Sequence, residues 1–250
     1  SRMLISGAAP ISPEVLRFFA GLDLVIYEGY GQSETSAPST FNAPGAVRLG
    51  SVGKLVPGMQ SRVTEEGELF VKGPNIFKGY MKNNDATADS FTGDGWMRTG
   101  DVVNIDDDGF VFITGRIKDI IITAGGKNIT PANLETDLMN IALVEHAVVV
   151  GDAKPYLSAL LTLSADGLAA FAKKHGLEGD IRNHPKVIEA LQDGVDQLNT
   201  RHARVENIRK FAVLPGAFSV EGGELTPTMK VKRKVVIERN REIVESLYAK

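Results

Sequence analysis

The stretch from Gly115 to Glu135, GRIKDIIITAGGKNITPANLE, joins two halves of the chain whose patterns differ. Its β-branched run Ile120–Ile122 favours a buried strand, and the pair Gly125-Gly126 favours a tight turn where backbone can approach a neighbour closely. Thr130 and then Pro131 predict a helix start, as N-cap and first helical residue. From these residues alone, the stretch predicts a hairpin that leads into a helix, with its charged residues at the surface.

The residues before this stretch predict an α/β subdomain followed by antiparallel strands. A strand at Leu4-Ile5, a helix from Ser12 to Ala20 and a strand at Leu24–Tyr27 predict a parallel crossover unit. Ligands bind beyond the carboxyl ends of such strands, so residues 6–10 and 28–35 are candidate binding loops. Between residues 45 and 79, short strands with glycine and proline turns predict a small, distorted antiparallel β-barrel.

The residues after the stretch predict a compact α/β domain of ordinary size. Strands are expected at residues 147–150, 157–163 and 211–214, and a helix is expected from Ser164 to Gly176. Pro185 begins a longer helix with an apolar stripe that predicts a core face. The stripe consists of Val187, Leu191, Val195 and Leu198.

Composition argues against several classes of protein. The net charge of -3 gives no general attraction to nucleic acid, and the basic C-terminal segment lacks interleaved aromatic residues. No apolar run approaches the roughly 18 to 20 residues that span a bilayer. With 0 cysteines, and 4 histidines without ligand spacing, a zinc site is not expected. These features suit a cytoplasmic protein, and peripheral association with a membrane stays open.

Two segments carry polar groups that could bind a ligand. YEGYGQSET, residues 27–35, is by pattern a common glycine-containing loop. Its ring could instead stack on a base, its hydroxyl could donate to a phosphate and its carboxylate could hold magnesium. Asp101, at the end of GWMRTGD, is either ordinary turn chemistry or an acceptor for a ribose diol. The acidic run Asp106–Asp108 is interpreted as a hairpin turn rather than a metal site.

These segments, the stretch from Gly115 and the C-terminal sequence PTMKVKR together resemble the motifs of the acyl-adenylate-forming family, in the same order. That family includes acyl-CoA synthetases, non-ribosomal adenylation domains and firefly luciferase. The forms TAGGKN and PTMKVKR are similar to those of long-chain fatty acyl-CoA synthetases. The resemblance covers essentially the whole chain. It implies that residues 1–115 complete a large AMP-binding domain and that residues 116–250 form a mobile C-terminal lid.

The resemblance implies a role for each matching residue in nucleotide binding. Tyr30 would lie against adenine, and Ser33, which stands where threonine is usual but keeps the hydroxyl, would meet the α-phosphate. Glu34 would ligate magnesium, Asp101 would bind the ribose hydroxyls, and Arg116 would hold ribose and phosphate. The remaining expected nucleotide-binding residues are Gly7, Ala8, Ala9 and Gly31.

The resemblance also implies two alternating sites in the lid. Lys230 would reach the substrate carboxylate and the α-phosphate of ATP during adenylation. The lid would then turn about Lys118 and present the Gly125-Gly126 loop to the active site when coenzyme A is bound. The implied reaction converts a fatty acid and ATP into acyl-AMP and pyrophosphate, and coenzyme A then displaces AMP to give a thioester.

The expected function is therefore that of a long-chain fatty acid-CoA ligase. The family's loop that cradles the ATP phosphates is expected upstream of Ser1, in an N-terminal half of the same chain, so these residues alone are expected to be inactive. Two alternatives stay open: an adenylation enzyme that loads a carrier protein, and a non-catalytic nucleotide-binding module.

Overall fold

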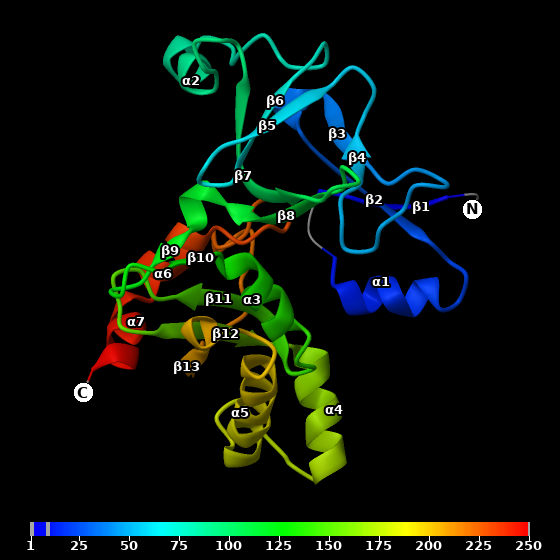
Figure 1. Cartoon of the computed structure of the whole chain (residues 1–250). Helices are drawn as coiled ribbons and strands as arrows, with labels where there is room; N and C mark the ends of the chain where they lie inside the picture. The colour runs from blue at the N-terminus through cyan, green and yellow to red at the C-terminus, as the bar shows by residue number, and fades with distance from the viewer. Residues whose placement is uncertain (1–2, 9–10, 250) are drawn as a thin grey trace. The chain divides into compact units, whose positions relative to one another are not determined.

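The chain divides into two compact units, Ser1–Asp119 and Ile120–Lys250, in a computed structural model that describes residues 3–8 and 11–249 (Figure 1). The resemblance placed this boundary four residues earlier, between residues 115 and 116. The difference has a structural reason, because strand β8 (Val111–Arg116) pairs with β7 (Met97–Ile105) as far as Arg116. The short helix η2 (Ile117–Asp119) also contacts β7, so it stays with the first unit.

The first unit begins with the predicted crossover. Strand β1 (Leu4–Ser6) pairs in parallel with β2 (Ile26–Gln32), and α1 (Pro13–Ala20) connects them. The Ser12 hydroxyl accepts a hydrogen bond from the Glu14 amide at 3.2 Å, which confirms the expected N-cap. Strands β3 (Ala37–Phe41) and β4 (Lys54–Leu55) extend the same sheet in antiparallel fashion.

A second sheet in this unit is entirely antiparallel. It has the order β5 (Gln60–Val63), β6 (Glu68–Lys72), β7, β8, with α2 (Asn84–Asp89) between β6 and β7. The antiparallel architecture was predicted, but the described strands form two open sheets and not a closed barrel. Two backbone hydrogen bonds join the sheets, from Val52 N to Val111 O at 2.8 Å and from Val111 N to Gly53 O at 2.9 Å.

The second unit begins with a hairpin and a helix, as the sequence predicts. Strands β9 (Ile121–Ile122) and β10 (Asn128–Ile129) pair in antiparallel fashion, and α3 (Pro131–Met139) follows. Of the isoleucines in the expected buried strand, Ile121 is 3% exposed but Ile122 is 52% exposed. Thr130 occupies the N-cap position of α3, although its side chain makes no capping hydrogen bond.

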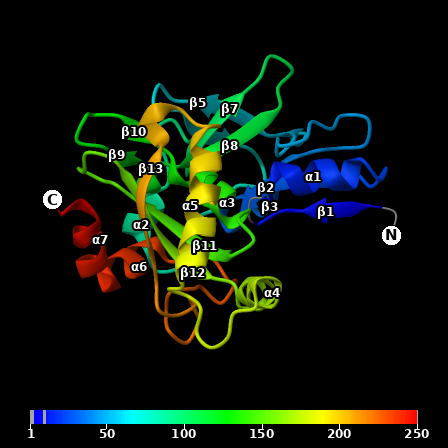
Figure 2. The same cartoon turned by 90° about the horizontal axis from the view of Figure 1, so that it is seen from below.

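The centre of the second unit is a three-stranded sheet covered on both faces. Strand β12 (Leu157–Leu163) is buried throughout and lies between β11 (Val144–Val150), antiparallel to it, and β13 (Ile208–Val213), parallel to it. Helices α3 and α5 (Pro185–Asn199) cover one face, and α4 (Ala165–His175) contributes partly buried residues to that core (Figures 1 and 2). The predicted stripe of α5 is buried there.

Two C-terminal helices, which the sequence analysis did not predict, cover the other face of this sheet. They are α6 (Arg233–Arg239) and α7 (Arg241–Tyr248), and they pack against Val148, Val150 and Leu160. Two short 3-10 helices, η1 (Ser33–Thr35) and η3 (Arg204–Glu206), complete the described structure. Among residues 3–8 and 11–249, no helix has both the length and the apolar character needed to cross a membrane.

Candidate functional site

The first unit brings three of the predicted residues together around one buried carboxylate. Strand β7 places Asp101 opposite Arg116 of β8, and the Arg116 Nε donates to Asp101 Oδ1 at 3.0 Å. The Tyr30 hydroxyl, from β2, donates to Asp101 Oδ2 at 2.6 Å. The Asp101 side chain is 5% exposed, whereas that of Arg116 is 62% exposed. A carboxylate held this firmly is a pre-organised hydrogen-bond acceptor.

Gln32 belongs to the same cluster, although the sequence analysis did not single it out. Its Nε2 donates to Asp101 Oδ2 at 2.7 Å and to the Thr99 carbonyl at 2.8 Å, and lies 3.2 Å from the Tyr30 hydroxyl. Alternate residues of a strand point to the same face, so the spacing of Tyr30 and Gln32 was a usable signal. Burial, and then the charge of Asp101, raises the pKa of Tyr30, so its hydroxyl remains a donor.

Glu34, the expected magnesium ligand, lies in η1 directly after β2. The Tyr80 hydroxyl donates to Glu34 Oε1 at 2.6 Å, and this bond raises the pKa of Tyr80. Within the described residues, no group of three or more histidine, cysteine or acidic side chains is placed to hold a metal. One carboxylate still fits magnesium, because this ion is commonly held by one or two carboxylates together with substrate phosphates.

The segment after β1 lies beside β2, because β2 continues to Gln32 and includes residues 28–32 of the predicted second binding loop. Ser6 is paired with Glu28, and a Cβ at Gly7 would come 3.2 Å from the Gly29 carbonyl oxygen. Ala8 follows with a φ of 65°, and the expected residue Ala9 lies outside the described residues. Gly31, near the end of β2, and Ser33, in η1, are exposed.

The second unit contains the two expected lid sites, and Lys118 lies in η2 at the end of the first unit. The Gly125-Gly126 turn connects β9 to β10, and Gly126 adopts a φ of 72°, which favours glycine. Hydrogen bonds connect this hairpin to the loop between β11 and β12. The Ala124 amide donates to the Lys154 carbonyl at 2.9 Å, and the Ile122 amide donates to Asp152 Oδ1 at 3.1 Å.

Lys230 is exposed at the tip of a tight hairpin in the second unit. The Thr226 amide donates to the Lys230 carbonyl at 2.8 Å, and the Lys230 amide donates to Thr226 Oγ1 at 3.0 Å. At the base, Leu225 pairs with Val231 and is 0% exposed in the core beneath α6. The hairpin therefore presents a lysine from a buried base.

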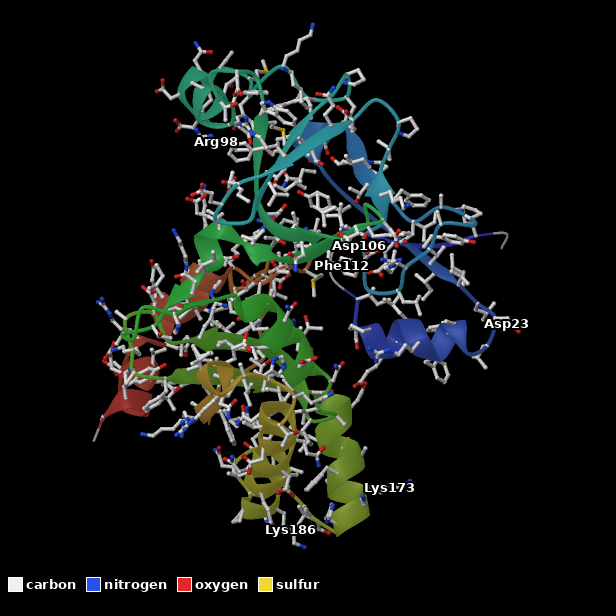
Figure 3. The ribbon with its side chains drawn as sticks, in the orientation of Figure 1. Asp23, Arg98, Asp106, Phe112, Lys173 and Lys186 are labelled. Atoms are coloured by element: carbon white, nitrogen blue, oxygen red, sulfur yellow. The ribbon has the colours of Figure 1, made fainter. Side chains whose placement is uncertain are left out.

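The acidic turn was correctly interpreted as a hairpin turn. Asp106, labelled in Figure 3, begins the segment that connects β7 to β8, and its carboxylate pairs with Arg48. Asp108 Oδ2 accepts from Arg48 Nη2 at 2.7 Å. These carboxylates serve an ion pair within the first unit.

Comparison with known proteins identifies the two parts of the chain separately. Residues 1–81 match the sequence model named AMP-binding enzyme, and residues 118–250 match the AMP-binding enzyme C-terminal domain. The long-chain-fatty-acid–CoA ligase FadD15 of Mycobacterium bovis is 44% identical, over 100% of this chain and 42% of that protein. The human long-chain-fatty-acid–CoA ligase ACSBG1 is 38% identical, over 97% of this chain and 37% of that protein.

Solved structures of adenylation domains are similar to nearly the whole of this chain. The adenylation domain of a carboxylate reductase from Mycobacterium chelonae has a TM-score of 0.79 at 26% identity, over 98% of this chain and 38% of that one. The A-PCP didomain of the carboxylic acid reductase from Segniliparus rugosus, in complex with AMP, has a TM-score of 0.81 at 26% identity, over 99% and 34%. The chain spans about two fifths of the length of the curated relatives named above. Because the C-terminal domain model alone matches more than half of its residues, this chain belongs to the AMP-binding enzyme family.

Proposed function

We propose that the full-length protein containing these residues is an AMP-forming long-chain fatty acid-CoA ligase that works in the cytoplasm, with access to membrane surfaces. The observation that carries this proposal is the convergence of Tyr30, Asp101 and Arg116 from three different strands. These are the residues that the family resemblance assigns to the nucleotide. The identity of 44% and 38% to relatives named as long-chain-fatty-acid–CoA ligases supports the substrate class.

In this proposal, the Asp101 cluster binds the nucleoside. A carboxylate offers about four lone-pair sites, and Tyr30, Gln32 and Arg116 together occupy three of them. A ribose diol would therefore use the remaining site and displace one protein donor, for which the exposed Arg116 is best suited. One of the five N–H donors of Arg116 goes to Asp101, so the others can serve ribose or phosphate oxygens.

The phosphate groups would lie against the segment after β1, the end of β2 and η1. The Ser33 hydroxyl would donate to the α-phosphate, and backbone of Gly7, Ala8, Ala9 and Gly31 would line the approach. Glu34 would hold magnesium, which when bound offsets negative charge on the phosphates. The Tyr80 hydroxyl would orient Glu34, because it already donates to one oxygen of that carboxylate.

Lys230 would act in the first half-reaction. A fatty acid carboxylate oxygen forms a bond to the α-phosphorus of ATP while the bond to pyrophosphate breaks, which brings anions together. The Lys230 ammonium is a compact positive charge on a flexible stem, and it can offset that repulsion in the transition state. The variant Lys230→Ala should therefore lose rate and keep its fold.

The Gly125-Gly126 turn would act in the second half-reaction. The thiol of coenzyme A attacks the acyl carbonyl carbon, and AMP leaves. Because this turn and Lys230 belong to the same unit, one rotation about Lys118 would withdraw the lysine and bring the turn forward. That exchange would explain why both sites lie in one domain.

The test is an assay of the full-length protein with ATP, coenzyme A and long-chain fatty acids, beside Lys230→Ala. We expect wild-type protein to form the thioester, and Lys230→Ala to lose adenylation but still convert supplied acyl-AMP to thioester. Lys234→Ala, which removes an exposed lysine of α6, is the matched control and should behave as wild type. Transfer to a phosphopantetheine carrier instead of coenzyme A would contradict the ligase and support the carrier-loading alternative.

A further inference from the structure

The Lys230 hairpin is connected to the opposite side of its unit by Arg233, the first residue of α6. The Arg233 guanidinium donates from one terminal nitrogen to Glu135 Oε1 on α3 and from the other to the Val149 carbonyl on β11. The Val149 amide donates to the same Glu135 oxygen at 2.8 Å. Three elements of the second unit are thereby joined at one point, only three residues after Lys230.

This connection is shielded from water. The side chains of Arg233 and Glu135 are 16% and 19% exposed, whereas the hairpin tip, with Met229 at 63%, is open to solvent. Hydrogen bonds between charged groups are stronger than neutral ones, and burial reduces their screening by salt. The planar guanidinium can reach a carboxylate and a carbonyl simultaneously, which a lysine ammonium cannot do with the same geometry.

The short backbone segment from Lys230 to Arg233 connects the anchored arginine to the hairpin tip. The Lys232 amide donates to the Glu224 carbonyl at 2.7 Å, so the strand-like base of the hairpin is closed beside Arg233. At the tip, Met229 adopts a φ of 63°, an unfavourable left-handed conformation for a non-glycine residue. Such a conformation persists only where its surroundings determine it. Leu225 in the core holds one arm of the hairpin, and Arg233 holds the other.

We propose that Glu135 and Arg233 are positioning residues for Lys230 and so act on adenylation alone. This inference rests on the proposed function, in which Lys230 serves only the first half-reaction. Without the Arg233 anchor, the second arm of the hairpin loses its connection to α3 and β11, and the ammonium is spread over more positions. The second half-reaction, for which the lysine is withdrawn, does not depend on where the hairpin tip lies.

The experiment compares Arg233→Met and Glu135→Gln with wild type in the full-length protein. Three quantities are measured: pyrophosphate release with fatty acid and ATP, thioester formation from supplied acyl-AMP, and Tm. We expect pyrophosphate release to fall about ten- to a hundredfold, as for a misplaced catalytic group, while thioester formation stays within about twofold. Arg233→Lys should fall between wild type and Arg233→Met, since it keeps the charge and loses the two-pronged geometry.

Arg182→Met is the matched control, because Arg182 also joins a carboxylate, Asp180, to a backbone carbonyl, that of Pro215, in the same unit. It should leave both half-reactions unchanged. A parallel fall of both half-reactions in Arg233→Met, or no fall in either, would overturn the inference and leave the network a structural one. If Lys230→Ala itself fails to separate the half-reactions, the proposed function is what fails. If Lys230→Ala separates them and Arg233→Met does not, only the positioning role is lost.

Discussion

The amide nitrogen of Gln32 fixes the position of Asp101, because it connects that carboxylate to the Thr99 carbonyl two residues before it. We expect Gln32→Leu to raise the KM for ATP about ten- to a hundredfold, since a lost hydrogen bond to a charged group costs roughly 1.5 to 3 kcal/mol. The measurement is the ATP dependence of pyrophosphate release by the full-length protein. Gln60→Leu, at an exposed position of β5, is the control. An ATP dependence identical to that of wild type would show that Gln32 does not support the nucleotide site.

Glu28, a buried residue of the same strand, makes the stability of the first unit depend on pH. Burial raises the pKa of Glu28 from 4.5 to about 6, against the opposing effect of a hydrogen bond from the Gly50 backbone. Between these pH values the folded state keeps a proton that the unfolded state has lost, so stability falls as pH rises through the window. The full cost, above pH 6, is about 2 kcal/mol from this shift.

Glu28→Gln should therefore stabilise the first unit at pH 7 by about 1 to 2 kcal/mol and remove the contribution of Glu28 to its pH dependence between pH 4.5 and 6. Fluorescence of Trp96 during urea unfolding is a suitable measurement, because the chain has 1 tryptophan and it lies in this unit. At pH 4 the two proteins should have nearly equal stability. An equal offset at every pH would mean that the substitution acts through packing and not through the proton.

At the scale of elements, the helices that the sequence predicted are those with a signal at their N-terminus. Ser12 and Ser164 accept capping hydrogen bonds for α1 and α4, and prolines begin α3 and α5. Helix α6 follows Lys232, which is not a capping residue, and Asn240 before α7 makes no side-chain capping bond, so the start signals of these helices are weak. The described strands are antiparallel, as predicted, but they do not close into a barrel, because closure depends on pairing between distant strands, which a local pattern does not contain.

The candidate site also contains residues that the sequence could predict and a contact that it could not. Tyr30, Asp101 and Arg116 could be named because they lie in motifs of recognisable form, and Gln32 could have been found from strand alternation. The bond between Tyr80 and Glu34 could not be predicted, since 46 residues separate the partners and no periodic pattern relates them. Only the folded chain brings these partners together.

The approach of β3 to the segment before β4 depends on Gly53. A Cβ at this position would lie 1.9 Å from the carbonyl carbon of Phe41, and its φ is 84°. Gly45 has a similar φ of 81° with open space around it, so it separates backbone strain from steric overlap. We expect Gly45→Ala to cost about 1 to 3 kcal/mol from strain alone, and Gly53→Ala to cost clearly more. Urea unfolding followed by Trp96 fluorescence measures both, and equal costs would contradict the close approach.

At the scale of the whole chain, each unit has its own hydrophobic core. Every residue of the two cores that enclose β11, β12 and β13 comes from Ile120–Lys250, and the core around Leu69 and Met97 comes from Ser1–Asp119. A region with a separate core can unfold as a separate cooperative unit. This independence is what a lid that turns against a larger domain would need.

Leu161→Ala should therefore destabilise the second unit by about 2 to 5 kcal/mol and leave the Trp96 transition of the first unit unchanged. Leu161 is 0% exposed in the centre of β12, so its truncation leaves a cavity that the sheet and α5 cannot easily close. Trp96 fluorescence reports the first unit alone, and far-UV circular dichroism reports both units, so a circular-dichroism transition without a fluorescence change belongs to the second unit. Residues 120–250 expressed alone should show the same loss on Leu161→Ala. If the variant shifts both transitions equally, the two units unfold together, and the lid does not have the independent stability that its proposed rotation requires.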